Sequence, residues 1–212
     1  MPNPKSEIRN PKSPPPRPVI GILGGVGAGK SLVASQLAQL GCEVVDADRI
    51  GHALLDEPRI RQAVRERFGD EVFDPSGRVD RQCLGRRVFG SPEDLEALEA
   101  ILQPELTERV RRAVLDARGG TAAAVVLDAP LILEKGLDAL CDFMVYVSVP
   151  VEVRQGRVRR ARGWNPSEVV RREASQISLK TKQDRADYIV DNSASPEHTL
   201  EQIRAILSRA VK

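Results

Sequence analysis

The sequence predicts an α/β fold in which a five-stranded parallel sheet is flanked by helices and carries an inserted helical subdomain and a helical lid. Three observations predict this class. Five short apolar runs have the length of buried strands, and stretches with helical spacing separate them. A glycine-rich loop joins the first run to the first helical stretch. A charged, helical segment from 50 to 119 interrupts the alternation between the second run and the third.

The first apolar run, Val19–Leu23, leads directly into the glycine-rich loop. The loop reads Gly24-Gly25-Val26-Gly27-Ala28-Gly29-Lys30-Ser31. It matches the pattern G-x-x-x-x-G-K-[ST], in which glycines let the backbone turn its N–H groups around an anion. Lys30 adds positive charge, and Ser31 offers a hydroxyl ligand for Mg²⁺. A helix follows, and its N-terminus would also favour phosphate. This helix should end at Gly41.

The alternatives to a phosphate loop are a flexible glycine loop and a dinucleotide-binding loop. A merely flexible glycine loop would not require the order strand, loop, helix that the sequence shows. The dinucleotide pattern G-x-G-x-x-G begins with Gly25-Val26-Gly27, but its last position is Lys30 rather than glycine. The sequence therefore favours a nucleotide-binding fold of the P-loop NTPase type.

The second apolar run, Cys42–Asp48, ends in two carboxylates. In open parallel sheets ligands bind outside the carboxyl ends of the strands, so these acids should face the same crevice as the loop. If the strand persists, the spacing puts Asp46 and Asp48 on one face, with Asp48 further into the cleft. The alternative is that they cap a helix beginning near Arg49.

Residues 50–119 predict a helical subdomain inserted into the sheet domain. Ser91 and Pro92 provide an N-cap and a first-turn proline for a helix with one apolar stripe. Pro104 should break or restart that helix, and a second apolar stripe continues to Gly119. Both stripes are interpreted as core.

The third run, Ala122–Leu127, is followed by Asp128. An apolar strand ending in an acid is typical of a Walker-B element, whose carboxylate holds Mg²⁺ directly or through water. Phe143–Val149 and Tyr188–Val190 supply the fourth and fifth strands of the predicted sheet.

An arginine-rich stretch lies between the last two strands and contains one acid, Glu168. Its arginines are Arg154, Arg157, Arg159, Arg160, Arg162, Arg171 and Arg172. Such a run can be a solvated helix face, but beside a polyphosphate loop it favours a mobile arginine lid over ATP, spanning about 152–182. A nucleic-acid surface is the rival interpretation, although Trp164 is the only aromatic residue in the run.

The amino-acid composition limits the number of domains and the kinds of ligand that this chain can have. Of the 212 residues 41% are hydrophobic and 29% are charged, which allows one domain over 19–212. Residues 1–18 are rich in proline and are expected to form a disordered leader; their charge of +3 exceeds the net +2 of the whole chain. The nearly neutral remainder argues against nucleic-acid binding.

Cysteine usage and hydropathy bear on location. The three cysteines show no paired spacing, which favours reduced, buried thiols. No apolar run approaches the ~20 residues that span a bilayer, and the N-terminus lacks the apolar segment of a signal peptide. We expect a cytoplasmic protein without membrane contact, either a monomer or a weak homo-oligomer.

Together these segments resemble the dephospho-coenzyme A kinases, from about Val19 to the C-terminus. Besides the loop, the matching segments are Val45-Asp46-Ala47-Asp48, Val79-Asp80-Arg81, Val88-Phe89, Ala129-Pro130-Leu131-Ile132-Leu133-Glu134, Arg162-Gly163, Gln176 and Ala186-Asp187-Tyr188-Ile189-Val190-Asp191-Asn192. The resemblance implies transfer of the ATP γ-phosphate to the ribose 3′-hydroxyl of dephospho-coenzyme A, the last step of coenzyme A synthesis.

The resemblance also implies roles for individual residues. The nucleotide is expected at Gly25, Val26, Gly27, Ala28, Gly29, Lys30, Ser31, Leu32 and Asn192. Mg²⁺ is expected at Ser31 and Asp128. Catalysis is expected to depend on Lys30, on Asp48 as the base that orients the acceptor hydroxyl, and on the lid residues Arg157 and Arg162. Acceptor-binding residues are expected to be Asp48, His52, Arg81, Gln103, Pro130 and Leu131.

Two positions depart from the family pattern. Leu32 replaces the threonine that usually follows the motif serine, and Gln103 replaces the histidine that usually precedes Pro104. Gln103 can hydrogen-bond but cannot titrate near neutral pH, so a role of that position at the acceptor is in doubt.

Two other functions stay open from sequence alone. One is a kinase for another small acceptor, such as a nucleoside monophosphate or a sugar acid, because such enzymes share the loop and the lid. The other is a nucleotide-dependent regulatory module; the guanine-selecting pattern N-K-x-D is absent, which counts against a GTPase switch.

Overall fold

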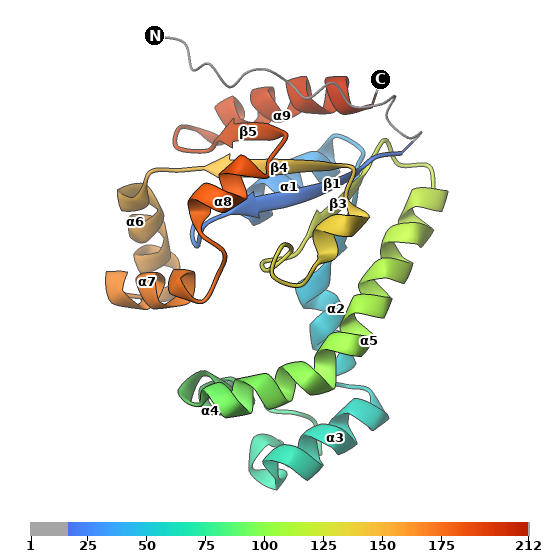
Figure 1. Ribbon diagram of the computed structural model, residues 1–212, viewed down its shortest axis with the longest axis vertical. Coiled ribbons are helices and arrows are strands. Elements are labelled where there is room, and N and C mark those ends of the chain that lie inside the picture. The colour runs from blue at the N-terminus through green and yellow to red at the C-terminus, as the bar shows by residue number, and fades with distance from the viewer. Residues whose placement is uncertain (1–16, 212) are drawn as a thin grey trace. The chain divides into compact units, whose positions relative to one another are not determined.

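The computed structural model describes residues 17–211, and it divides into two compact units (Figure 1). The sheet unit comprises the described residues up to Val45 together with those from Val114 onward. The helical unit comprises Asp46–Ala113. Most of the predicted leader, residues 1–16, lies outside the described part of the chain. The phosphate loop and the arginine-rich stretch both belong to the sheet unit.

The sheet unit is built on five parallel strands in the order β2-β3-β1-β4-β5. Their bounds are β1 Val19–Gly24, β2 Glu43–Asp46, β3 Val125–Asp128, β4 Phe143–Ser148 and β5 Tyr188–Asp191. The predicted parallel sheet is confirmed. The central strand is β1, whose Gly21 pairs with Leu127 on one side and Met144 on the other. The strand that carries the loop therefore lies between β3 and β4.

Helices cover both faces of this sheet. On one face α1 (Lys30–Gln39) and α9 (Pro196–Ala210) pack against each other, and residues such as Val33, Leu37 and Ile203 join the strand residues in one core. On the other face α8 (Leu179–Asp184) packs against β1. Packing there is tight, because a Cβ atom on Gly21 would lie within 2.9 Å of side-chain atoms of three residues.

The arginine-rich stretch forms two helices, α6 (Val151–Arg162) and α7 (Pro166–Ala174). Asn165 caps α7, accepting a hydrogen bond from the Glu168 N–H at 2.9 Å, and Ser195 caps α9 in the same way at 3.3 Å. The short 3₁₀ helix η2 (Leu137–Leu140) precedes β4.

The helical unit has its own small core. It contains α2 (Ala47–Leu54), α3 (Pro58–Phe68), η1 (Asp70–Val72), α4 (Arg81–Gly90) and the first part of α5 (Pro92–Gly119). Its buried residues are Leu55, Ile60, Val64, Phe68, Val72, Val79, Leu84 and Val88. An ion pair joins two of its helices, with Arg87 Nε 3.2 Å from Asp94 Oδ2.

The expectation that the second strand persists through Asp48 is wrong. β2 ends at Asp46, and Asp48 lies in the first turn of α2. The cause is local: the Asp46 side chain accepts a hydrogen bond from the Arg49 N–H at 2.9 Å and so caps the helix. The capping interpretation therefore holds for Asp46, and Asp48 adds an acid that favours the helix N-terminus.

The expectation that Pro104 breaks the helix is also wrong, since α5 runs without interruption from Pro92 to Gly119. A proline in a helix interior removes one hydrogen bond and costs about 3 kcal/mol. Side-chain interactions span this point, because Gln103 Nε2 donates to Thr107 Oγ1 at 3.1 Å. Apolar residues before the proline also pack on the core of the helical unit. The predicted N-cap is confirmed, with Ser91 Oγ accepting from the Asp94 N–H.

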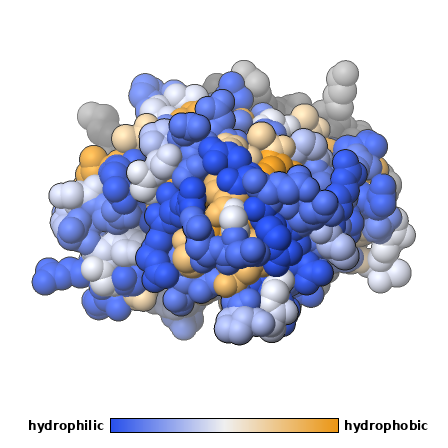
Figure 2. All heavy atoms as spheres, turned by 90° about the horizontal axis from the view of Figure 1, so that it is seen from below, coloured by the Kyte–Doolittle hydropathy of each residue, from blue (hydrophilic) through white to orange (hydrophobic). Residues whose placement is uncertain are grey.

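Among the described residues no helix is both long enough and apolar enough to cross a membrane. The face shown in Figure 2 is mostly hydrophilic, with apolar side chains gathered in only small areas.

Candidate nucleotide site

The phosphate loop connects the end of β1 at Gly24 to the start of α1 at Lys30. Three of its glycines have positive φ, with values of 154° at Gly24, 76° at Gly27 and 87° at Gly29. A residue with a side chain would be strained at each of these angles. The turn is closed by a hydrogen bond of 3.2 Å from Ala28 N–H to the Gly25 carbonyl. The glycines are thus required by the backbone path.

The start of α1 is suited to an anion. Its N-cap is Gly29, which has no side chain to accept hydrogen bonds from the first-turn N–H groups. The ammonium of Lys30 reaches back over the loop and donates to the carbonyls of Gly24 at 3.1 Å and Gly25 at 3.3 Å. Ser31 is exposed on the first turn. Backbone N–H groups, a cation and a hydroxyl therefore meet at a helix N-terminus, the arrangement that binds phosphate.

Asn192 lies behind the loop and supports it. Its side-chain Nδ2 donates to the Ala28 carbonyl at 2.8 Å, and its Oδ1 accepts from Thr199 Oγ1 at 2.9 Å. The residue is 1% exposed, and a Cβ atom on Gly29 would be 2.4 Å from Nδ2. Arg157 donates to the Asn192 carbonyl at 2.8 Å. These hydrogen bonds give Asn192 a loop-supporting position, and a direct contact with nucleotide stays a prediction.

Helices α6 and α7 contact the same loop from another side. Arg154 in α6 donates to the Val26 carbonyl at 3.0 Å, while Glu173 in α7 accepts from the Val26 N–H at 2.9 Å. The guanidinium and the carboxylate also form an ion pair with each other. A Cβ atom on Gly27 would lie 2.6 Å from Val158 of α6. The loop and α6 are therefore packed against each other with no room for larger residues.

Some arginines of the stretch have specific partners, whereas Arg159, Arg160, Arg162 and Arg171 are exposed, as on a solvated helix face. Arg154 is 4% exposed and reaches the loop. The guanidinium carbons of Arg162 and Arg172 lie 4.8 Å and 4.0 Å from the centre of the Trp164 ring, a cation–π arrangement. Arg172 also pairs with Glu168 at 2.8 Å. The predicted lid role of Arg157 and Arg162 is not decided by these contacts.

Asp128 is the last residue of β3, one position beyond the pair Gly21–Leu127 that joins β3 to β1. It therefore lies at the same sheet edge as the phosphate loop. Pro130 and Leu131 follow it, with Pro130 exposed. No group of three His, Cys, Asp or Glu residues that could hold a metal occurs in residues 17–211. The predicted Mg²⁺ site consists of one serine hydroxyl and one carboxylate, so it is not a site built from three such residues.

A buried ion pair lies between the segment after β3 and α8. Lys182 Nζ is 2.9 Å from Glu134 Oε1, the same oxygen that accepts the Ile177 N–H, and Lys182 is 1% exposed. Burial alone would raise the pKa of Glu134, but hydrogen bonds from Lys182 and from backbone N–H groups outweigh it and lower the pKa. This pair ties the segment that follows α7 to the segment that follows β3.

We expect Lys182→Met to lower the free energy of unfolding by about 3–5 kcal/mol, because it leaves the Glu134 carboxylate buried without its cation. Lys180→Met in the same helix is the matched control. Lys180 pairs with Asp184 at 3.0 Å but its side chain is 82% exposed. The control should therefore cost only about 0–1 kcal/mol. Urea denaturation of both variants measures the difference, and equal losses would contradict a stabilising role for the buried pair.

The same pair predicts a pH dependence. Because the pKa of Glu134 is lower in the folded state, the stability it contributes is present above the unfolded pKa and is lost as pH falls through the folded pKa. Between about pH 7 and about pH 3, the parent should therefore lose more free energy of unfolding than Lys182→Met does, since an ordinary glutamate titrates near pH 4.3. Identical pH profiles would contradict this.

The remaining predicted residues belong to the helical unit. Asp48 and His52 lie on α2, Arg81 begins α4, and Gln103 lies on α5. Arg81 donates to the His52 carbonyl at 3.2 Å and lies 3.5 Å from Asp56 Oδ2. The helical unit thus places the Arg81 guanidinium at the backbone of His52, whereas the Gln103 side chain donates to Thr107.

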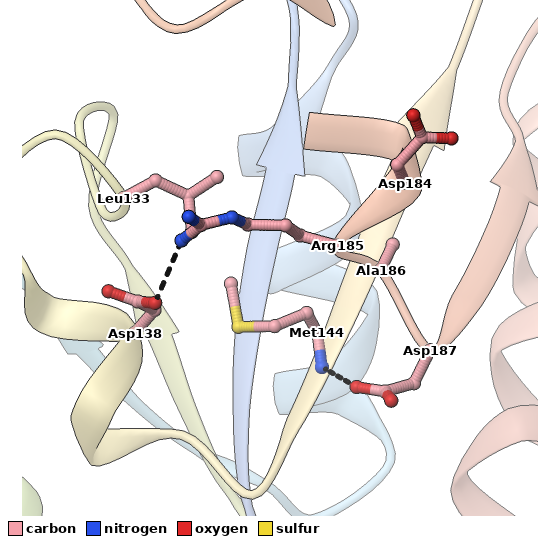
Figure 3. Close-up of a pocket in the computed structure, with 7 residues that line it drawn as sticks. All are labelled: Leu133, Asp138, Met144, Asp184, Arg185, Ala186 and Asp187. Carbon is pink, nitrogen blue, oxygen red and sulfur yellow. Dashed lines mark hydrogen bonds and ion pairs between the residues drawn. The ribbon is translucent and has the colours of Figure 1, made fainter. Parts of the chain in front are cut away.

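A hollow at the opposite edge of the sheet is not part of this site. Figure 3 shows Arg185 pointing toward Asp138, 3.6 Å away, and the Met144 N–H donating to Asp187 Oδ2 at 2.8 Å. These residues stand before or at the starts of β4 and β5, whereas the loop follows the end of β1. Their polar groups bond to one another, which indicates a structural role.

Neither Glu173 nor Thr199 is predicted from the sequence as a residue of this site, and nothing in the sequence distinguishes Arg154 from the other arginines. Glu173 follows two arginines in a charged helix, and Thr199 lies in the first half of α9. No local pattern marks either residue, because their partners Val26 and Asn192 are known only from the fold.

This chain is similar to known proteins over most of its length. The family model described as "Dephospho-CoA kinase" matches residues 18–198. A dephospho-CoA kinase of Symbiobacterium thermophilum is 41% identical over 189 residues, covering 88% of this chain and 79% of the relative. One of Carboxydothermus hydrogenoformans is 36% identical over 193 residues, covering 91% and 94%.

Solved structures share the fold. TT1252 of Thermus thermophilus superposes with a TM-score of 0.75 at 34% identity, covering 91% of this chain and 97% of that one. A dephospho-CoA kinase of Campylobacter jejuni has a TM-score of 0.65 at 21% identity, covering 92% and 98%, and so supports the fold alone. With the family model matching most of its length, this chain belongs to the dephospho-CoA kinase family.

Proposed function

We propose that this protein transfers the γ-phosphate of ATP to the ribose 3′-hydroxyl of dephospho-coenzyme A, giving coenzyme A and ADP. The observation that carries the proposal is a complete phosphate loop in a chain that belongs to the dephospho-CoA kinase family. Within this proposal, the lid, the helical unit and the named site residues have the following tasks.

The groups around the loop fit a polyphosphate and a magnesium ion. Positive-φ glycines at Gly27 and Gly29 turn the backbone, and α1 begins without a capping side chain. Ser31 and Asp128 offer a hydroxyl and a carboxylate, the hard oxygen ligands that Mg²⁺ prefers. When bound, Mg²⁺ would neutralise negative charge on the phosphate oxygens.

Phosphoryl transfer requires positioning and charge stabilisation rather than covalent chemistry by the protein. Lys30 and the loop N–H groups would hold the β- and γ-phosphates. Arg157 and Arg162 would cover the transferring group; a guanidinium has five N–H donors, so the bond from Arg157 to the Asn192 carbonyl does not prevent this. Asp48 would orient the acceptor hydroxyl and accept its proton.

The acceptor carries phosphate groups of its own, and the helical unit offers cations for them. Arg78 and Arg81 line one polar hollow of that unit, which also contains the carboxylates of Asp56, Asp74 and Asp80. The guanidinium of Arg81 is held by the His52 carbonyl and by Asp56. These contacts fix the position of the Arg81 guanidinium, while the roles of Arg81 and His52 at the acceptor rest on the family resemblance. The roles of Gln103, Pro130 and Leu131 at the acceptor rest on the family resemblance.

The test is ADP release by the purified protein with Mg²⁺ and ATP, compared across acceptors in one coupled assay. Dephospho-coenzyme A, AMP, CMP, gluconate, shikimate and no acceptor are the arms. We expect strong turnover with dephospho-coenzyme A alone. Turnover with another acceptor in its place would refute the assigned substrate, and ADP release that ignores all acceptors would refute a small-molecule kinase.

A further inference from the structure

Two residues of the arginine-rich stretch hold the backbone of one loop residue, Val26, at its N–H and at its carbonyl. The Glu173 carboxylate accepts the Val26 N–H at 2.9 Å, and Arg154 Nη1 donates to the Val26 carbonyl at 3.0 Å. The two side chains are also paired with each other. Arg154 Nε donates in addition to the Val149 carbonyl at 3.3 Å, which anchors the guanidinium beneath the loop.

The pair is buried and leaves no space around the neighbouring glycine. The side chains of Arg154 and Glu173 are 5% and 20% exposed. A Cβ atom on Gly25 would lie 2.7 Å from Arg154 Nη1 and 2.7 Å from Glu173 Oε1. Gly25 is therefore required here for space. A charge pair at this depth is stable only while both partners are present.

The pair also joins the two ends of the lid at the loop. Arg154 lies in the first turns of α6, and Glu173 lies near the end of α7. Between these ends the chain carries Trp164 with Arg162 and Arg172 against its ring. Loop conformation and lid position therefore depend on the same two side chains.

Charge determines what each partner contributes when a nucleotide is present. An ATP phosphate in the loop places several negative charges near the Val26 peptide, and an uncompensated carboxylate there would repel it. Arg154 compensates the Glu173 charge and reaches the loop itself. Loss of the arginine should therefore weaken nucleotide binding much more than loss of the carboxylate charge.

We propose that Arg154 and Glu173 are positioning residues that hold the two peptide groups on either side of Val26 in their phosphate-binding conformation and set the affinity of the loop for ATP. The inference rests on the proposed function only as far as ATP binding. Neither residue is assigned a contact with the reacting atoms.

The test measures the Kd of a non-hydrolysable ATP analogue with Mg²⁺ by calorimetry, with no acceptor present. Arg154→Met should raise Kd at least about tenfold, because it leaves the carboxylate unpaired beside the loop. Glu173→Gln should change Kd by less than about threefold, since an amide oxygen can still accept the Val26 N–H. The double variant should bind at least about threefold better than Arg154→Met, which is the coupling that a double-mutant cycle detects.

The control and the enzyme kinetics separate positioning from general destabilisation. Arg185→Met removes an exposed pair with Asp138 at the far edge of the sheet, and should leave Kd unchanged. In Arg154→Met the KM for ATP should rise while kcat at saturating ATP stays within about threefold of the parent. A purely structural defect would instead lower the melting temperature with Kd of the folded fraction unaltered.

Two results would overturn the proposal: a Kd for Arg154→Met within about threefold of the parent, or a double variant that binds no better than Arg154→Met. Should Arg154→Met fail to fold, Arg154→Lys takes its place, because lysine keeps a cation but lacks the fork that reaches both Val26 and Glu173. Its Kd should rise at least about threefold, and an unchanged Kd would refute the pair. Because no acceptor is present, failure of dephospho-coenzyme A as substrate would leave these results unaffected.

Discussion

Lys30→Ala is expected to slow phosphate transfer about a thousandfold. The Lys30 ammonium lies over the loop and donates to the carbonyls of Gly24 and Gly25, so it is already placed where phosphate charge would be held. Removal of one preorganised electrostatic group costs about 10²–10³ in kcat. The alanine variant also loses the side chain's contacts with the loop, and the loss should be at the upper end of that range.

The measurement for Lys30 is the coupled assay with dephospho-coenzyme A, run with Lys30→Arg alongside. Arginine keeps the charge on a longer, planar group that cannot take the same position, so Lys30→Arg should retain only a small part of the activity. Melting temperatures of both variants confirm folding. Turnover of Lys30→Ala within about tenfold of the parent would contradict the assignment of this segment as a catalytic phosphate loop.

The phosphate loop could be predicted from sequence because each of its positions has a local reason. Gly27 and Gly29 are needed for backbone angles that other residues avoid, and both have positive φ in the structure. The parallel sheet could be predicted for a similar reason, since short apolar runs alternated with helical ones. These features depend on residues close together in the chain.

The contacts that support the loop could not be predicted, because they depend on residues far apart in the chain. Glu173 is 147 positions from Val26, and Asn192 is 164 positions from Ala28. Residues so far apart in the sequence form no local pattern from which their contact could be predicted. The arginine-rich stretch shows the same limit: its charge was visible, but only the fold shows that Arg154 is buried against the loop while Arg162 lies on Trp164.

Where the sequence left alternatives, small local energies decided between them. A strand through Asp48 and a helix capped by Asp46 were both compatible with the pattern, and one hydrogen bond to the Arg49 N–H accompanies the helix. Such a cap is worth about 1 kcal/mol. At Pro104 the local preference would end the helix, but α5 continues through it. Packing of the neighbouring helix residues on the core outweighs the cost of the proline.

The position of Asp48 after β2 leads to the second large expected effect. Asp48→Asn should lower kcat at least tenfold, because general-base catalysis contributes about 10²–10⁴ and an amide of the same shape cannot accept a proton. The Kd of an ATP analogue should not change, since the groups proposed to hold the phosphates, Lys30 and the loop N–H groups, belong to the sheet unit and Asp48 to the helical unit. A fall in kcat without a change in nucleotide affinity is the signature of a group that acts on the acceptor hydroxyl.

Asp46→Asn is the matched control for Asp48→Asn. It makes the same chemical change two residues earlier, and asparagine caps a helix about as well as aspartate, so α2 should keep its start. The control should retain the turnover of the parent. If both variants lose activity equally, the loss comes from the start of α2 and not from a base at Asp48; if Asp48→Asn keeps full turnover, Asp48 takes no part in the proton transfer.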